Sequence, residues 1–295
     1  MGDLDELVKG AFRSIYHHRA FHMQSSISIL IRSYNSAKTL RILLSKLHLA
    51  DDDEILIVDS GSTDSTVSIA REFGTKIINA PPPFNYSKSL NLGFAAAQNP
   101  WVLVLSSHSI PVVPDLLDIY RMVISTLPAD VAVCYGPSVI DGRQDPGLPS
   151  QDASFYQSCD YQDVQRICGN ANTFYRRDAW VTLPFDESIA TAEDKAWLQQ
   201  ALCDGKRFAY LPQARCVNKN MGSLAYMFRK GQRDMRALRL SGRPPVPIRH
   251  LLGGIVRTIG RMLRGEINAG NCIRHCAHTL GQFVGSYRTP TNSAS

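Results

Sequence analysis

Short apolar runs alternate with segments of helical periodicity in the first third of the chain. The runs ISILI (27–31), EILIV (54–58), KIIN (76–79) and WVLVL (101–105) have the length of buried strands, and the segments 36–47, 63–73 and 87–97 between them gather their apolar residues on one helical side. Strands that alternate with helices predict βαβ units and a mainly parallel central sheet. The chain is therefore expected to be an α/β protein.

The rest of the chain is less regular. Residues 136–166 are rich in Gly, Pro, Asp and Gln without periodicity, which predicts a long loop over the sheet. Residues 191–202 form a helical pattern that opens with two acids, and RFAYL (207–211) has the pattern of another strand. Residues 1–26 are expected to form a helical lead before the α/β domain.

Polar residues follow three of the four predicted strands. They are Arg32, Ser33 and Tyr34 after the first strand, Asp59 after the second, and Ser106, Ser107 and His108 after the fourth. A polar strand end is also what contact with water produces. However, ligands of parallel α/β sheets bind at the carboxyl ends of the strands, so three such ends together favour a functional site at that edge.

Five short motifs occur in a fixed order along the chain. They are SYN (33–35), VDSGSTDST (58–66), NLG (91–93), PFDE (184–187) and ED (193–194). In this order and spacing the chain resembles the family 2 glycosyltransferases, with the nearest likeness to bacterial rhamnosyltransferase-like members. The resemblance covers roughly residues 27–222, which are expected to form the catalytic domain.

The resemblance implies the nucleotide-sugar-binding fold called GT-A. It also implies a transferase that moves a hexose or rhamnose, with inversion at the anomeric carbon, from a nucleotide-sugar donor to a hydroxyl of a polysaccharide or lipid-linked precursor. The residues that match nucleotide-sugar-binding positions, or that lie beside them at the strand ends, are Ser33, Tyr34, Asp59, Asn85, Lys88, Ser107 and His108. Asp194 matches the catalytic base, and Glu193 is the other half of the same acid pair.

The chemistry of sugar transfer independently favours an acid at this place. A carboxylate beside the acceptor hydroxyl acts as general base, which typically contributes about 10²–10⁴-fold in rate. Asp194 lies in the first turn of its predicted helix, where the helix dipole stabilises negative charge. Acids also occur there simply as helix-terminal residues, and the upstream motifs favour the catalytic interpretation.

The sequence departs from the family pattern where a metal ligand is expected. Members usually hold Mn²⁺ or Mg²⁺ with an aspartate after the fourth strand, but this chain has Ser107, His108 and Ser109 there, and VNKN (217–220) where a second ligand often lies. One imidazole with amides is a poor Mg²⁺ site. Four expectations follow: Mn²⁺ or Mg²⁺ binds weakly, His108 binds a softer ion such as Mn²⁺, protonated His108 contacts the diphosphate, or transfer is metal-independent with Lys88 and Lys219 as nearby cations.

The carboxyl-terminal part is strongly basic. Residues 224–295 hold 12 Lys and Arg against 2 Asp and Glu, although the whole chain carries only +6. Residues 248–264 place apolar residues on one helical side and Arg257, Arg261 and Arg264 on the other. A basic helical extension is thus expected over 223–295. Its apolar side is expected to meet an anionic membrane, the catalytic domain or a second subunit.

Composition limits the location and the class of protein. With 44% hydrophobic and 20% charged residues the chain is expected to be folded. It has seven cysteines without a C-x-x-C pair, no apolar run of membrane-spanning length, and an acidic start unlike a secretory signal. We expect a cytoplasmic protein, peripheral on the inner face of the membrane.

Two other functions remain open from the residues. The missing acid at 107–109 is compatible with a non-catalytic nucleotide-binding or scaffolding protein of the same fold. The basic tail is compatible with nucleic-acid binding, but its four aromatic residues are scattered rather than interleaved with basic residues for base stacking. We therefore expect no nucleic-acid partner.

Overall fold

The computed structural model describes residues 26–80, 82–124, 127–140, 154–156, 169–189, 192–218, 224–240 and 245–287. They divide into two compact units, an α/β unit that holds both sheets and a helical unit in the carboxyl-terminal part of the chain. The helical lead predicted over residues 1–26 lies outside the described residues, apart from Ser26.

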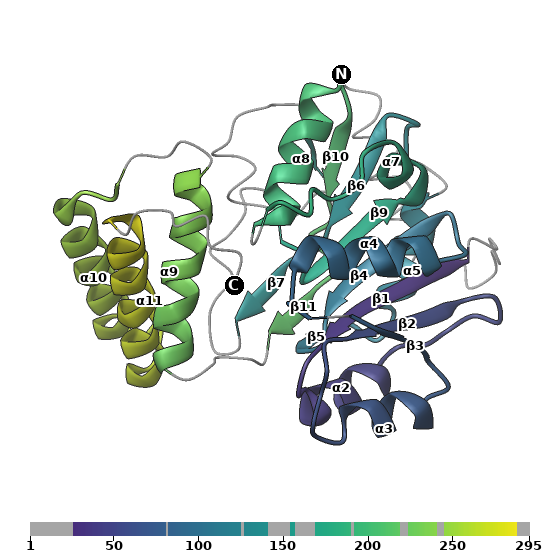
Figure 1. Ribbon diagram of the computed structural model, residues 1–295, viewed down its shortest axis with the longest axis horizontal. Coiled ribbons are helices and arrows are strands. Elements are labelled where there is room, and N and C mark those ends of the chain that lie inside the picture. The colour runs from purple at the N-terminus through teal and green to yellow at the C-terminus, as the bar shows by residue number, and fades with distance from the viewer. Residues whose placement is uncertain are drawn as a thin grey trace. The chain divides into compact units, whose positions relative to one another are not determined.

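An eight-stranded sheet forms the centre of the α/β unit, in the order β3-β2-β1-β4-β9-β6-β10-β8 (Figure 1). The strands are β1 (Ile27–Ser33), β2 (Glu54–Asp59), β3 (Lys76–Asn79), β4 (Trp101–Ser106), β6 (Val131–Tyr135), β8 (Ser154–Tyr156), β9 (Asn172–Arg176) and β10 (Arg207–Tyr210). Strands β3, β2, β1 and β4 run parallel, β9 is antiparallel to β4 and β6, and β10 is parallel to β6 but antiparallel to β8. The expected α/β fold with a mostly parallel sheet is confirmed.

A second sheet contains three short strands, β5 (Ser109–Pro111), β11 (Cys216–Asn218) and β7 (Ser138–Ile140). Both β7 and β8 fall within residues 136–166, where the sequence predicts a long loop, so the described part of this range contains two short strands that the prediction missed. Both strands have only three residues and depend on neighbours far along the chain, because β8 pairs with β10 and β7 lies beside β11. A run this short has no periodicity to detect.

Helices cover both sides of the large sheet. On one side lie α2 (Ala37–Leu44), α3 (Thr66–Glu72) and α5 (Leu116–Ile124), and on the other lie α4 (Tyr86–Ala96), α7 (Arg177–Thr182) and α8 (Glu193–Cys203). Successive strand residues point to opposite sides: Ile29 and Ile31 join the first hydrophobic cluster, and Leu30 joins the second. The sheet is therefore buried on both sides, which explains its near-continuous apolar strands.

The strand register brings the predicted polar ends to one edge of the sheet. Ser33 pairs with Asp59 across β1 and β2, and Arg32 pairs with Ser106 across β1 and β4. The prediction that these residues share an edge is confirmed. Strand β1 runs two residues beyond the apolar run, so Arg32 and Ser33 end the strand rather than follow it.

The helical unit consists of α9 (Leu224–Leu240), α10 (Ile248–Leu263) and α11 (Ala269–Tyr287). Helices α9 and α11 pack backbone to backbone: a Cβ atom added at Gly281 would lie 2.1 Å from the carbonyl oxygen of Phe228. Helix α10 packs on α11, where Gly254 faces Thr279. Among the described residues, no helix combines the length and apolar character needed to cross a membrane.

Candidate active site

Asp59 organises the loop that follows β2. The residue is 4% exposed, and its Oδ2 accepts hydrogen bonds from the backbone N–H groups of Gly61 (3.0 Å) and Ser62 (2.9 Å). The Ser62 hydroxyl donates to Oδ1 at 2.5 Å. Gly61 has φ +84°, a left-handed conformation that favours glycine. The carboxylate thus shapes the loop, and it retains acceptor capacity for a ligand.

The loop after β1 is tied to the loop after β2. Asn35, with φ +46°, donates its backbone N–H to the Ser62 hydroxyl (2.9 Å) and accepts from the Thr63 backbone at Oδ1 (2.8 Å). The backbone N–H of Ser36 donates to Thr66 Oγ1 at 2.7 Å. The SYN and DSGSTD motifs therefore form one structural element, although they lie about 27 residues apart.

Two residues at the end of β1 have exposures that suit ligand binding. Tyr34 is 60% exposed, so its ring is available to stack on a planar group. Ser33 is 3% exposed, and its hydroxyl has no hydrogen-bond partner among the described residues. A buried unsatisfied hydroxyl at a sheet edge is what a ligand or water satisfies.

The SSHS segment after β4 forms a tight turn into β5. The Ser107 hydroxyl, 4% exposed as a residue, donates to the Ser36 hydroxyl at 2.8 Å. Burial, together with the smaller effect of the positive charge of Arg32, lowers the pKa of His108 to about 4. His108 is therefore neutral at neutral pH without a ligand, and its protonation beside a bound diphosphate stays a prediction.

The residues around this turn do not fit a divalent-metal site. No group of three His, Cys, Asp or Glu side chains in the described part of the chain converges as metal ligands need. Ser107 is already bonded to Ser36, and Arg32 places a positive charge near His108. Asn218 ends β11, whereas Lys219 and Asn220 lie outside the described residues.

The acid pair begins α8, as predicted, and its two members differ in surroundings. Glu193 is 6% exposed and forms an ion pair with Arg32, whose Nη1 lies 2.9 Å from its Oε1. Burial raises the pKa of Glu193, while Arg32 acts in the opposite direction. Arg32 also lies 4.9 Å from the centre of the Tyr86 ring. Glu193 is thus a buried carboxylate that contacts Arg32 and Asn170 through Oε1.

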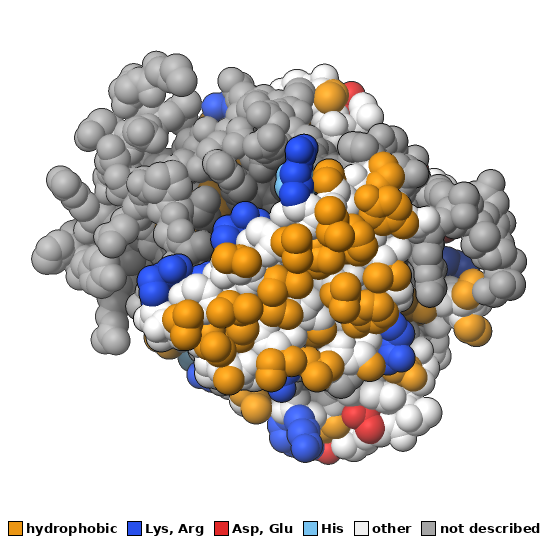
Figure 2. Space-filling view, turned by 90° about the vertical axis from the view of Figure 1, so that its left-hand side faces the viewer, with side chains coloured by type: hydrophobic (Ala, Val, Ile, Leu, Met, Phe, Trp, Pro, Cys, Tyr) orange, Lys and Arg blue, Asp and Glu red, His pale blue; other side chains and the backbone are white. Residues whose placement is uncertain are grey.

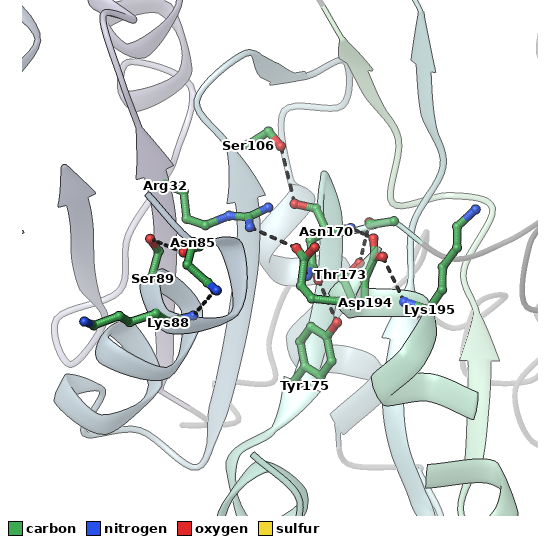
Figure 3. Close-up of polar contacts among 12 residues, drawn as sticks. Arg32, Asn85, Lys88, Ser89, Ser106, Asn170, Thr173, Tyr175, Asp194 and Lys195 are labelled. Atoms are coloured by element: carbon green, nitrogen blue, oxygen red, sulfur yellow. Dashed lines mark hydrogen bonds and ion pairs between the residues drawn. The ribbon is translucent and has the colours of Figure 1, made fainter. Parts of the chain in front are cut away.

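Asp194 is partly exposed and is held by two backbone groups. The backbone N–H of Asn170 donates to its Oδ2 at 3.0 Å, and that of Lys195 donates to its Oδ1 at 2.8 Å (Figure 3). The carboxylate is therefore held beside Asn170, and the residue as a whole is partly exposed. Of the two acids, Asp194 has the geometry of a group that meets a substrate.

Asn170 joins both acids to the sheet. Its Nδ2 donates to Glu193 Oε1 at 3.3 Å, and its Oδ1 accepts from the Tyr175 hydroxyl at 2.6 Å. Its carbonyl oxygen accepts from the Ser106 hydroxyl at 3.4 Å, so the network reaches the end of β4 (Figure 3). Sequence reasoning missed Asn170 and the role of Arg32, because neither residue lies in a motif that marks it.

The NLG and PFDE motifs hold each other in place. Asn91 donates from Nδ2 to the Phe185 carbonyl (2.9 Å) and to Glu187 Oε1 (3.0 Å), and its Oδ1 accepts from the Phe185 N–H (3.0 Å). Asn85 caps α4 by accepting from the Lys88 N–H (2.9 Å) and donates to the Glu187 carbonyl (2.7 Å). In Figure 3 the Lys88 side chain points away from Arg32 and Asp194. Asn91 and Asn85 thus fasten the loop before the acid pair to α4.

Comparison with known proteins assigns a family to this arrangement. The model of the family described as "Glycosyl transferase family 2" matches residues 28–181, which is more than half of the chain. A TPR repeat-containing protein of Synechococcus elongatus is 38% identical over 55 residues, which are 19% of this chain and 14% of that protein. The chain thus spans only a small part of that relative.

Solved structures share the fold at low sequence identity. A mannosyltransferase from Pyrobaculum calidifontis, in complex with GDP-Man and Mn²⁺, aligns over 97% of this chain and 84% of its own, with TM-score 0.55 and 13% identity. Glucosyl-3-phosphoglycerate synthase from Mycobacterium tuberculosis aligns over 76% and 85%, with TM-score 0.53 and 15% identity. TarS from S. aureus (residues 1–349) aligns over 73% and 64%, with TM-score 0.54 and 17% identity. The α/β unit therefore has the fold of GT-A glycosyltransferases.

Proposed function

Because this chain belongs to glycosyl transferase family 2, we propose that it transfers a sugar from a nucleotide-sugar donor to a hydroxyl of a polysaccharide or glycolipid precursor, with inversion at the anomeric carbon. The resemblance of its motifs favours a hexose or rhamnose as the sugar. Two structural relatives were solved with GDP-Man or with UDP-glucose, which supports this class of donor.

The placement of Asp194 carries the proposal. It lies partly exposed at the carboxyl edge of the sheet, and the Asn170 and Lys195 backbones hold its carboxylate. Asp194 takes the proton of the acceptor hydroxyl while that oxygen attacks the anomeric carbon. The bond from this carbon to the diphosphate oxygen breaks, and the electron pair leaves with the nucleoside diphosphate. One displacement from the opposite side inverts the configuration.

The donor nucleoside is assigned to the edge formed by β1 and β2. The exposed Tyr34 ring stacks on the base, and Asp59 accepts a hydrogen bond from the base or ribose through its remaining acceptor sites. The buried Ser33 hydroxyl, which lacks a partner among the described residues, contributes a further hydrogen bond. Asp59 keeps the loop in shape at the same time, because it also binds Gly61 and Ser62.

The diphosphate is assigned to the end of β4, beside Arg32 and His108. The leaving group needs positive charge, and Arg32 is a permanent cation at this edge. Lys88 contributes through its charge if its side chain turns toward the ligand. A bound diphosphate would raise the pKa of His108 from its low value, because a nearby negative charge favours the protonated form.

Metal dependence is expected to be weak, since the described residues do not supply the oxygen ligands that Mg²⁺ prefers. Transfer measured in the presence of a chelator should persist at a substantial fraction of the untreated rate. Adding Mn²⁺ should raise the rate more than adding Mg²⁺ if His108 is a ligand. If the chelator abolished transfer and Mg²⁺ alone restored it fully, a carboxylate metal ligand would have to lie elsewhere. That result would contradict this part of the proposal.

The general-base assignment is tested with Asp194→Asn. Donor binding is first established by a thermal-shift screen of UDP-glucose, GDP-mannose and dTDP-rhamnose, because a ligand raises apparent stability by mass action. The variant should lower turnover by at least about 10²-fold while the nucleotide dissociation constant is unchanged. Asp204→Asn, which removes an acid just after the same helix, is the matched control and should keep wild-type turnover. Near-normal turnover of Asp194→Asn would refute the assignment.

A non-catalytic nucleotide-binding role is the second candidate, favoured by the lack of a converging acidic cluster among the described residues. Hydrolysis of the bound donor separates the two functions. An enzyme of this class should release the nucleoside diphosphate slowly even without acceptor, and Asp194→Asn should reduce that release. If wild type and Asp194→Asn both bind the donor but neither releases nucleoside diphosphate nor transfers sugar, the scaffolding role is established instead.

A further inference from the structure

Helix α10 carries an exposed apolar stripe along its whole length. Its members recur at spacings of three or four residues, which places them on one side of the helix, and they are 40–78% exposed: Ile248, Leu252, Val256, Ile259 and Leu263. Leu251, on a neighbouring flank of the helix, is 8% exposed. The stripe is therefore distinct from the buried flank of α10 that carries Leu251.

Helix α11 extends the same apolar surface. Its exposed apolar residues are Ile273 (54%), Leu280 (43%) and Tyr287 (59%), which recur every seven residues and so lie along one side of the helix. Figure 2 shows hydrophobic side chains gathered over much of this side of the molecule, in adjoining bands. We call these eight residues of α10 and α11 the apolar helical face. A contiguous exposed face of this kind marks an interaction site.

The charges around the apolar helical face are mostly positive. Residues 245–287 contain the basic residues Arg249, Arg257, Arg261, Arg264 and Arg274 but only one acid, Glu266. Glu266 is already paired with Arg261 and Arg264. In Figure 2, Lys and Arg side chains lie at the margins of the apolar surface, with very few acidic side chains. The surface thus combines an apolar centre with a positive rim.

We propose that the apolar helical face binds the surface of an anionic lipid bilayer. An amphipathic helix with a basic polar side lies in the plane of such a surface, with its apolar residues among the acyl chains and its cations at the headgroups. A helix of this length, which reaches about 24 Å at 1.5 Å per residue, suits binding along the surface. The described helices lack the features of a membrane span, so the contact is with one leaflet.

The charge favours lipid over a second copy of the chain as the occupant. Two copies that met through this face would bring their arginine-rich rims together, and like charges in proximity are destabilising. Anionic headgroups instead complement the rim, at about 1 kcal/mol for each Lys or Arg near the surface. The proposal concerns the helical unit alone and does not depend on the identity of the transferred sugar.

The test is co-sedimentation of the full-length protein with vesicles, without donor or acceptor. Wild type should sediment with vesicles of equal parts phosphatidylcholine and phosphatidylglycerol, and much less with phosphatidylcholine alone. The triple variant Leu252→Gln, Val256→Gln and Leu263→Gln should lower the partition coefficient by at least about tenfold, because it removes three apolar side chains from the lipid contact. These residues are 57%, 67% and 78% exposed, so the variant should fold.

A matched control replaces three exposed apolar side chains of the α/β unit in the same way. Ile42→Gln, Leu49→Gln and Val181→Gln change three apolar residues that are 45%, 46% and 57% exposed, and this variant should sediment as wild type does. Raised salt should weaken the binding, since the rim acts through screened charge. Equal sedimentation of the two triple variants, or no sedimentation of wild type, would overturn the proposal. The proposal would also be overturned, in favour of a second copy, if ultracentrifugation showed that wild type is a dimer and that the triple variant of Leu252, Val256 and Leu263 is a monomer.

Discussion

The substitution Arg32→Met tests the buried ion pair that supports the acid pair. Arg32 Nη1 lies 2.9 Å from Glu193 Oε1, and the two side chains are 13% and 6% exposed. Methionine keeps part of the apolar stem of arginine but removes the charge, so Glu193 loses its cation while its hydrogen bond from Asn170 remains available. The substitution therefore separates charge compensation from packing.

The expected loss of unfolding free energy is about 3–5 kcal/mol, the usual cost of removing one partner of a buried ion pair. Loss of the contact between the guanidinium and the Tyr86 ring, 4.9 Å away, adds about 1 kcal/mol. Protonation of Glu193 limits the total, because a neutral carboxyl group no longer needs a cation. The exposed pair Arg41–Glu72, with side chains 52% and 53% exposed, is the matched control. Arg41→Met should cost less than about 1 kcal/mol.

The pH dependence has a defined sign. Burial raises the pKa of Glu193 above its ordinary value of 4.5, against the opposing effect of Arg32. Across the interval between the unfolded and folded pKa the folded protein binds more protons, so the free energy of unfolding falls as pH rises. Removing Arg32 raises the folded pKa further and extends this fall to higher pH. Arg32→Met should therefore be more destabilising at about pH 8 than at about pH 5.

Urea unfolding at about pH 5 and pH 8 measures the free energies of unfolding of four proteins: wild type, Arg32→Met, Glu193→Gln and the double variant. The double variant should recover most of the stability lost in Arg32→Met, since glutamine is neutral and can still accept from Asn170. Two results would show that Arg32 does not compensate the charge of Glu193. One is a double variant that is as unstable as Arg32→Met, and the other is a loss of unfolding free energy in Arg32→Met that is the same at both pH values. The reasoning would then be refuted.

Two further predictions concern the nucleotide loop and the helical unit. Asp59→Ala should weaken UDP or GDP affinity by about 1–3 kcal/mol in calorimetry, because a donor group of the bound nucleoside is then left unpaired. Ser62→Ala keeps the carboxylate and should cost less affinity. Unchanged affinity in Asp59→Ala would place the nucleoside elsewhere. Gly281→Ala should destabilise the helical unit by about 1–3 kcal/mol, because its Cβ would lie 2.1 Å from the Phe228 carbonyl oxygen. Gly253→Ala meets nothing nearer than 3.4 Å and should stabilise its helix slightly in thermal unfolding, so a similar loss at both glycines would contradict the packing of α9 against α11.

Much of the first half of the α/β unit follows from the sequence alone. The apolar runs predict β1 to β4 and the helices between them, because a strand buried on both sides needs an unbroken apolar stretch. The shared edge of Ser33, Asp59 and Ser106 also follows, since the carboxyl ends of neighbouring parallel strands must meet. These properties depend on local pattern and on connections that span few residues.

Other features depend on contacts that no local pattern records. Arg32 meets Glu193 across 161 positions of the chain, and Asn170 reaches both acids only because β9 lies antiparallel to β4. The low pKa of His108 likewise depends on burial and on Arg32. On α10 the sequence predicts an apolar side, but only the structure shows that Leu251 is buried while Leu252 and Leu263 remain exposed. Burial and ion pairing are decided by which surfaces meet, and only the tertiary structure contains that information.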